Sequence, residues 1–318
     1  MIGARSGGMR DSVNHIAHLV HNRAALPAYA VRCERITKPG PNAKVSAKTF
    51  GPLAWLHFLG MAMSIALLVL SIAFSDGFAL LATIMLSILS TMIGFGSRWS
   101  LTLMQRKSVR RVPRDNIVIK YPNGAFLVVK CDENIARELY WHPEECDYTY
   151  GDTTYRIISL VGTLILMFGV ICLGNSTVRL QIGFAAAYII LNASYWTVAA
   201  FPPRWHWDLS CYVVEEERYE GGVLHENFTR ALWKAIAITQ SVDWVKSGQI
   251  APVSEAWKAW VEAAGDVVWR EKEKREAEGR RDCSLSDEKL DFIRPLPIWN
   301  AEDALTDFLN PDEPGKNV

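Results

Sequence analysis

Four long apolar stretches constrain the fold of this chain more than any other feature of its sequence. They cover residues 53–74, 78–95, 157–173 and 180–200, and none of them contains Asp, Glu, Lys or Arg. A helix needs about 20 apolar residues to cross the roughly 30 Å of hydrocarbon in a bilayer. The sequence therefore predicts an α-helical membrane protein with four transmembrane helices and the lipid bilayer as a partner.

The links between paired stretches are short. Residues 75–77, Ser-Asp-Gly, join the first two stretches, and residues 174–177, Gly-Asn-Ser-Thr, join the last two. Such links leave room only for a tight turn, and Asp and Gly are common turn residues. We therefore expect two transmembrane hairpins, over residues 52–95 and 157–201.

Basic residues gather on one side of the predicted membrane. The segment between the last two stretches carries only Arg179, whereas the sequences before the first stretch and after the second are rich in Lys and Arg. Cytoplasmic segments of membrane proteins carry this excess. Both termini are therefore expected in the cytosol, and the pattern does not indicate which organelle holds the protein.

The other residues form the predicted cytosolic parts. Residues 1–51 are basic and rich in Pro and Gly near position 40, so they are expected to be largely irregular. The segment 96–156 is too long to be a simple connection between helices, so it is expected to form structure of its own. Residues 202–281 are expected to form a strand and amphipathic helices, and residues 282–318 an acidic, disordered tail.

The central segment contains a hairpin signal. Residues 117–131 read IVIKYPNGAFLVVKC, in which two β-rich runs flank Asn123-Gly124, a pair that favours a type I′ turn. Asp132 is placed to cap a following helix. Two strands alone are marginal in water, so a third is expected from residues 211–214. The prediction is a small cytosolic β-β-α insertion.

The sequence after the fourth stretch indicates two helices. Apolar residues recur at helical spacing over residues 224–242 and again over residues 257–268. Ser254 is placed to cap the second helix. The charged run 270–281 is expected to be its solvated end.

Composition and spacing argue against several chemistries. The formal net charge is zero, so no nucleic-acid partner is expected. The cysteines are scattered without a Cys-x-x-Cys pair, which favours thiols over disulfides. His15, His18 and His21 drift off a shared helix face, so they are expected at the surface rather than on a metal. The sequence HWDLSC, residues 206–211, resembles a strand start more than a Cys-His site. We predict no catalytic, metal or cofactor-binding residue, and no cofactor.

Three residues of the fourth stretch are candidates for helix packing. Gly183 and Ala187 stand four residues apart, a spacing that lets helix backbones approach closely in lipid. Asn192 needs a polar partner in hydrocarbon and is expected to hydrogen-bond to a neighbouring helix. Gly162 and Gly169 are placed to pack in the same way on the third stretch.

Several segments together resemble a known family. The sequences YPNGAFLVVKCDENIARELYW, SLVGTLILMFGVICLGN, FAAAYIILNASYW and HWDLSCY are similar to those of an uncharacterised family of multi-pass membrane proteins from filamentous fungi. The resemblance covers roughly residues 50–260. It implies a fungal membrane protein, and it transfers no catalytic residue because that family has no assigned activity.

The function favoured by these features is non-enzymatic. We expect an integral membrane protein that binds a protein partner, or regulates one, through its cytosolic segments, with homo-oligomers as a further option. One alternative is an enzyme, or enzyme accessory, acting on a lipid or hydrophobic metabolite. A second alternative is a small oligomeric channel, for which the discriminating feature would be an intramembrane polar cluster. The absence of charged residues inside the four stretches argues against a coupled transporter.

Overall fold

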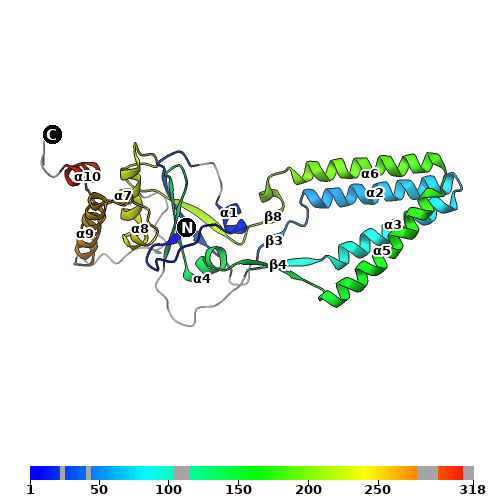
Figure 1. Cartoon of the computed structure of the whole chain (residues 1–318), viewed down its shortest axis with the longest axis horizontal. Coiled ribbons are helices and arrows are strands. Elements are labelled where there is room, and N and C mark those ends of the chain that lie inside the picture. The colour runs from blue at the N-terminus through cyan, green and yellow to red at the C-terminus, as the bar shows by residue number, and fades with distance from the viewer. Residues whose placement is uncertain (22–25, 41–43, 104–114, 278–292, 311–318) are drawn as a thin grey trace. The chain divides into compact units, whose positions relative to one another are not determined.

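The protein is described here by a computed structural model (Figure 1). The structure describes residues 1–21, 26–40, 44–103, 115–277 and 293–310.

Contacts divide the chain into two compact units. The first, called the α/β unit below, draws on residues 1–43, 103–143 and 211–318, and the second, called the helical unit, draws on residues 44–102 and 144–210. Each unit is assembled from segments far apart in the sequence. The predicted central segment 96–156 is therefore shared between the two units.

A five-stranded sheet forms the centre of the α/β unit. Its order is β1-β5-β6-β2-β9, in which β2 and β6 are parallel and the other neighbours antiparallel. The strands are β1 (Ile2–Gly3), β2 (Val31–Thr37), β5 (Asn116–Lys120), β6 (Phe126–Cys131) and β9 (Val213–Glu217). The expected third strand after the fourth apolar stretch is thus present, and it pairs with β2.

The prediction of a largely irregular N-terminal segment is wrong where that segment forms strands of the sheet, over β1 and β2. Strand β2 lies inside the sheet, between β6 and β9. Its charged residues suggested a loop, but they have partners in the fold. The guanidinium of Arg35 lies 2.5 Å from Glu217, and the carboxylate of Glu34 lies 2.6 Å from His21.

The β5–β6 hairpin forms as expected, but with another turn. Tyr121 N–H donates to the carbonyl of Ala125 at 2.9 Å, and Gly124 N–H donates to that of Tyr121 at 3.1 Å. The positive φ, +78°, belongs to Gly124, not to Asn123. Pro122 fixes its own φ near −65°, which fits a type I turn followed by a glycine bulge. The predicted type I′ turn is therefore wrong.

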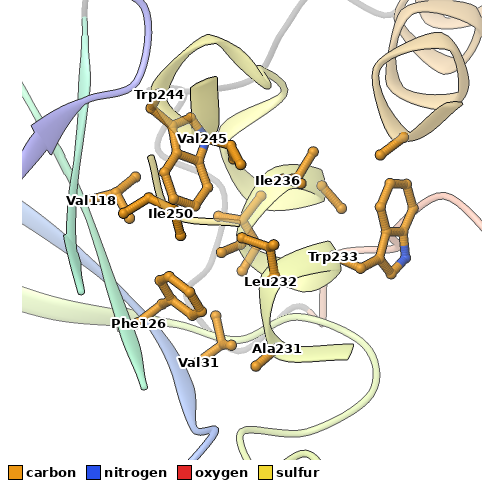
Figure 2. Packing of buried hydrophobic residues seen from close by; sticks show 14 of the residues in the cluster. Val31, Val118, Phe126, Ala231, Leu232, Trp233, Ile236, Trp244, Val245 and Ile250 are labelled. Carbon is orange, nitrogen blue, oxygen red and sulfur yellow. The ribbon is translucent and has the colours of Figure 1, made fainter. Parts of the chain in front are cut away.

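Helices cover both faces of the sheet. On one face, α7 (Phe228–Thr239) packs on β6 and β2, and Val31, Val118 and Phe126 belong to the main apolar core there (Figure 2). Residues of opposite parity face the other side, where His21, after α1 (His15–Val20), contacts Glu34. The short helices α4 (Glu133–Ala136) and η1 (Arg137–Trp141) lie with α1. Strands buried on both faces need continuous apolar runs, as β5 and β6 have.

Helices α8 and α9 follow α7 directly in the α/β unit. Gln240 adopts a left-handed conformation with a φ of +53°, and α7 ends there. The helix predicted over residues 224–242 is therefore shorter than expected. The next helix is α8 (Asp243–Ser247). In α9 (Glu255–Ala277) the hydroxyl of Ser254 accepts the N–H of Trp257 at 3.2 Å, as predicted. Residues 278–281 of the charged run lie outside the described residues.

Part of the expected disordered tail is ordered. Residues 301–309 form α10 (Ala301–Leu309), which packs against α9 and α7. The tail prediction is therefore wrong over α10, and residues 282–292 and 311–318 lie outside the described residues. Apolar residues between the acidic ones explain the order, because Ala301 is buried and Leu305 packs on the core.

The helical unit contains four helices that are long and apolar enough to cross a membrane. They are α2 (Pro52–Ala73), α3 (Gly77–Gly96), α5 (Asp152–Gly174) and α6 (Val178–Ala199), close to the expected stretches. Helix α2 packs on α3 and α6, and α3 packs on α5. These helices indicate a protein associated with a membrane.

Short strands join the apolar helices at the end away from the tight turns. Strand β3 (Ser46–Ala47) pairs with β8 (Trp207–Asp208), which follows η2 (Pro203–Trp205), and β4 (Trp99–Leu103) pairs with β7 (Glu144–Tyr148). The rings of Trp99 and Trp207 lie 6.2 Å apart. Tryptophans at this level are typical of a membrane interface.

Candidate functional site

The predicted packing residues of α6 have different surroundings. An added Cβ at Gly183 would lie 3.5 Å from the side chain of Leu67 on α2, and Ala187, one turn further, is buried. Gly183 therefore faces α2 at ordinary contact distance.

Asn192 does not make the expected bond. Its side chain is exposed, and its Nδ2 donates to the carbonyl of Tyr188 at 2.8 Å, four residues back on the same helix. A short polar side chain can satisfy itself locally in this way. Within the described residues, the predicted hydrogen bond to another helix is replaced by this local one.

The closest helix contacts lie between α3 and α5. A Cβ added to Gly162 would lie 3.3 Å from the side chain of Leu89, and one added to Gly169 would lie 3.1 Å from that of Leu86. Two glycines seven residues apart share one helix face, so they let α3 approach.

One carboxylate joins the two tight turns of the helical unit. Asp76 accepts the backbone N–H of Ala79 at 3.0 Å and so caps α3. Its second oxygen accepts the N–H of Thr177, the N-cap residue of α6, at 2.6 Å. The bonds from Thr177 and Ala79 lower the pKa of Asp76. The shared carboxylate stabilises two helix N-termini at once.

His21 is buried, which corrects the expectation of three surface histidines. Its Nδ1 lies 2.6 Å from Glu34, and its Nε2 lies 2.5 Å from the hydroxyl of Tyr140. Burial raises the pKa of Tyr140 well above its usual value, with the Glu34 charge adding to the effect. The chain Glu34–His21–Tyr140 joins β2 to η1 through polar groups that satisfy one another.

A second buried pair lies in the same unit. Lys38 Nζ donates to both carboxylate oxygens of Glu138, at 2.8 and 2.9 Å, and the hydroxyl of Tyr212 donates to the same carboxylate at 2.9 Å. The Lys38 ammonium also stands 5.4 Å from the Tyr212 ring centroid. A buried pair of this kind specifies which segments meet.

Glu217, at the end of β9, is surrounded by cations. Burial alone would raise its pKa, but Lys130, Arg294 and Arg35 together lower it. Arg35 Nε donates to this carboxylate at 2.6 Å, and the hydroxyl of Tyr219 donates to it at 2.9 Å. The cluster holds β2, β6, β9 and the tail together.

The remaining polar candidates are placed separately. Asp208 accepts the N–H of Ser210 at 3.1 Å in the helical unit, whereas Cys211 belongs to the α/β unit, where it is buried. Across the described residues, no group of three or more His, Cys, Asp or Glu side chains could hold a metal ion. The five described cysteines, Cys33, Cys131, Cys146, Cys172 and Cys211, form no disulfide with one another, and Cys283 lies outside the described residues.

A cavity of about 420 Å³ lies beside the glycine-rich N-terminal turn. The carboxylate of Asp115 accepts the backbone N–H groups of Arg5 and Ser6 at 2.7 and 2.9 Å. The carboxylate is thus engaged by the turn itself, and Trp141 forms part of the wall.

An apolar pocket of about 310 Å³ lies beside the start of α9. Its apolar lining comes from α8, from the loop after it and from α9: Val245, Ala251, Pro252, Val253, Trp257 and Val261. Val253 is 88% exposed at the rim, and Lys246, Lys258 and Glu262 add charge there.

Aromatic rings connect this pocket with the tail. Trp257 stands 5.3 Å from Trp260, Trp260 stands 5.4 Å from Trp299, and Trp299 stands 4.6 Å from Trp233. Sequence reasoning placed Trp257 and Trp260 on a helix but missed Trp299, because a lone Trp in an acidic segment gives no periodic signal. The face that carries Trp233 and Arg230 on α7 and Trp260 on α9, called the α7–α9 face below, is covered by the tail. The open pocket beside Trp257 is the strongest candidate for a site that binds another protein.

Comparisons with known proteins match no family model, no curated protein and no solved structure. The resemblance to a fungal membrane protein family stays a prediction.

Proposed function

We propose that this chain is a multi-pass membrane protein of the fungal family it resembles, and that its α/β unit binds a protein partner in the cytosol without catalysing a reaction. The four apolar helices would form two transmembrane hairpins. Their exposed side chains support this arrangement, since Ile189 and Trp196 are 65% and 74% exposed within the chain. An apolar surface of this extent is stable in lipid and costly in water.

The positions of the basic residues support the orientation. Lys and Arg lie beside the ends of the apolar helices where the short strands are, and the opposite turns carry Arg179. Both termini and the α/β unit would then face the cytosol.

The observation that carries the binding function is the open apolar pocket beside Trp257. Pockets that accept a partner's anchor side chain combine an apolar wall with a polar rim. Val253 is almost fully exposed there and lies outside the apolar core of the α/β unit. An apolar side chain of a protein partner would cover Val253 and Trp257.

The test is capture of partners from native membranes with matched variants. Val253→Asp places a charge in the pocket, while Leu224→Asp places one at another exposed apolar position of the same unit. We expect the wild type and Leu224→Asp to recover similar amounts of partner protein. The amount recovered with Val253→Asp should be at least tenfold lower. Equal recovery with all three would show that the pocket is not the binding site. A protease-protected N-terminal tag in sealed microsomes would overturn the orientation.

A further inference from the structure

The tail segment, residues 293–310, first contacts the rest of the α/β unit through backbone hydrogen bonds. Arg294 N–H donates to the carbonyl of Arg218 at 3.0 Å, and Glu220 N–H donates to the carbonyl of Arg294 at 3.1 Å. Arg294 thereby forms a parallel bridge with Tyr219, just beyond β9. Addition of an extended segment beside a strand is a common way to bind a peptide.

An aromatic anchor follows. The ring of Trp299 lies 4.6 Å from Trp233 on α7 and 5.4 Å from Trp260 on α9. The indole N–H of Trp260 donates to the carbonyl of Ala301 at 2.7 Å, and both of these residues are buried. The tail therefore provides both an apolar anchor and the hydrogen-bond acceptor that a buried tryptophan needs.

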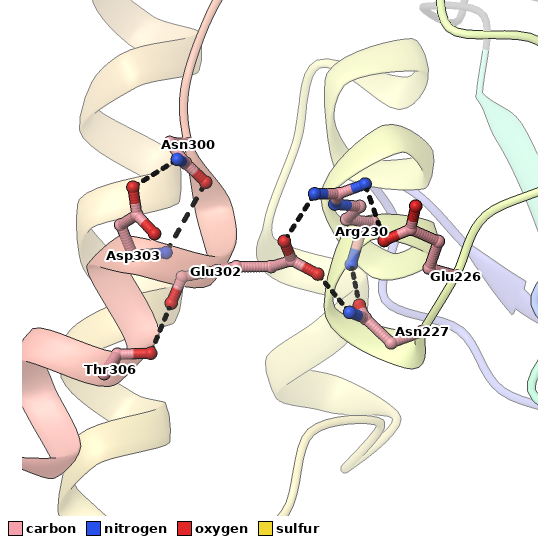
Figure 3. Close-up of polar contacts among 7 residues, drawn as sticks. All are labelled: Glu226, Asn227, Arg230, Asn300, Glu302, Asp303 and Thr306. Carbon is pink, nitrogen blue, oxygen red and sulfur yellow. Dashed lines mark hydrogen bonds and ion pairs between the residues drawn. The ribbon is translucent and has the colours of Figure 1, made fainter. Parts of the chain in front are cut away.

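A polar contact completes the attachment. Glu302 lies 2.6 Å from the guanidinium of Arg230, and its other oxygen accepts from the amide of Asn227 (Figure 3). The receiving side is organised by α7 itself, because Asn227 caps the helix through the N–H of Arg230 at 3.0 Å, and Glu226 holds Arg230 at 3.0 Å.

The tail carries its own helix-forming signals. The side chain of Asn300 accepts the N–H of Asp303 at the start of α10, and the Thr306 hydroxyl donates to the carbonyl of Glu302 at 3.0 Å. Its outer side remains exposed, with Ile298 101% accessible. A short segment that carries its own caps and attaches through a few concentrated anchors has the properties of a bound peptide, and its buried Ala301 adds to the apolar core.

We propose that residues 293–310 are an internal ligand of the α7–α9 face, which is a peptide-docking site that the chain's own tail occupies and releases reversibly. The site takes an aromatic side chain between Trp233 and Trp260, and a carboxylate three residues later on Arg230 and Asn227. The tail contacts Trp233, Trp260 and Arg230, which do not line the open pocket, so docking of the tail and binding of a partner at the pocket can be tested separately.

The experiment uses the full chain in detergent, with a specific protease site placed within residues 278–292. After cleavage, we expect the tail fragment to co-elute with the rest of the protein in size-exclusion chromatography. Excess synthetic peptide 293–310 should displace it. The Trp299→Ala peptide should need at least a tenfold higher concentration for the same displacement. The Ile298→Ala peptide should match the wild-type peptide because the Ile298 side chain is exposed to solvent.

A charge reversal tests the polar contact separately. The Glu302→Arg peptide should displace the fragment poorly from the wild-type protein and better from the Arg230→Glu protein. Immediate loss of the fragment after cleavage, unfolding on cleavage, or a fragment that excess native peptide never displaces would overturn the proposal. So would equal displacement by the Trp299→Ala and native peptides.

Discussion

Asp76 and Thr177 are joined by a hydrogen bond of 2.6 Å between a carboxylate and a backbone N–H, across 101 residues of sequence. Each residue lies in a tight turn between two apolar helices. The bond therefore ties the turn between α2 and α3 to the turn between α5 and α6. It also explains why the first turn contains an acid, because Asp76 accepts from Ala79 as well.

Replacing this carboxylate should loosen the helical unit. We predict that Asp76→Ala lowers the melting temperature of the detergent-solubilised protein by on the order of 3 °C. Asp76→Asn keeps only one acceptor oxygen, so it should retain one of the two bonds, to Ala79 or to Thr177, and lose the other. The pKa of Asp76 is lowered by Thr177 and Ala79. Its contribution is thus present above the unfolded pKa and lost as the pH falls through the folded value. A melting temperature for Asp76→Ala equal to that of the wild type would refute this role.

Helix packing should be most sensitive between α3 and α5. We predict that Gly169→Leu destabilises the protein by about 1–3 kcal/mol, because overpacking a close contact forces backbone shifts. Gly183→Leu should cost less, since its contact with Leu67 is looser. Thermal unfolding in detergent would compare the two with Ile189→Leu, an exposed control. If Gly183→Leu proved the more damaging, the α2–α6 contact would be the tighter one.

The α/β unit should lose stability in mild acid. Burial, helped by the charges of Lys234 and Arg230, lowers the pKa of His225 to about 4 from 6.5. Between these values the unfolded chain binds a proton that the folded chain does not, so stability falls as the pH falls through that window. His225 is only partly buried, so we expect an effect of about 1 kcal/mol after allowing for solvent screening.

The variant His225→Leu tests this origin of the acid sensitivity. Denaturant unfolding followed by tryptophan fluorescence at pH 4.5, 5.5, 6.5 and 8 should give a flatter pH profile for the variant. A profile parallel to that of the wild type would place the sensitivity elsewhere in the chain.

Removal of one member of the buried Lys38–Glu138 pair should be costly. Glu138→Leu leaves the Lys38 ammonium, whose side chain is 9% exposed, without its carboxylate. We expect a loss of about 3–5 kcal/mol in unfolding free energy. The double variant Glu138→Leu with Lys38→Met removes both charges and should recover part of the loss. A double variant as unstable as the sum of its single variants would show that the two residues do not interact.

Local signals were sufficient where the structure depends on neighbouring residues. The apolar helices, the β5–β6 hairpin and the Ser254 cap were predicted because each follows from residues close in sequence. The predicted turn type was wrong although all of its residues are adjacent in sequence. Pro122 fixes a negative φ at the first central position of the turn, which allows a type I turn and excludes type I′. Asn192 was likewise placed wrongly, since a carbonyl on its own helix was the nearer acceptor.

By itself, the sequence determined that four helices are apolar enough for lipid, because a run of about 20 uncharged residues is a property of the chain alone. Only the tertiary structure decided that β2 lies inside a sheet and that Trp299 anchors the tail. Both depend on partners far away in sequence: the charges of β2 meet His21 and Glu217, and Trp299 meets Trp233 and Trp260. A charged or isolated aromatic residue reads as exposed until the fold supplies the opposite charge or the apolar wall that makes its burial favourable.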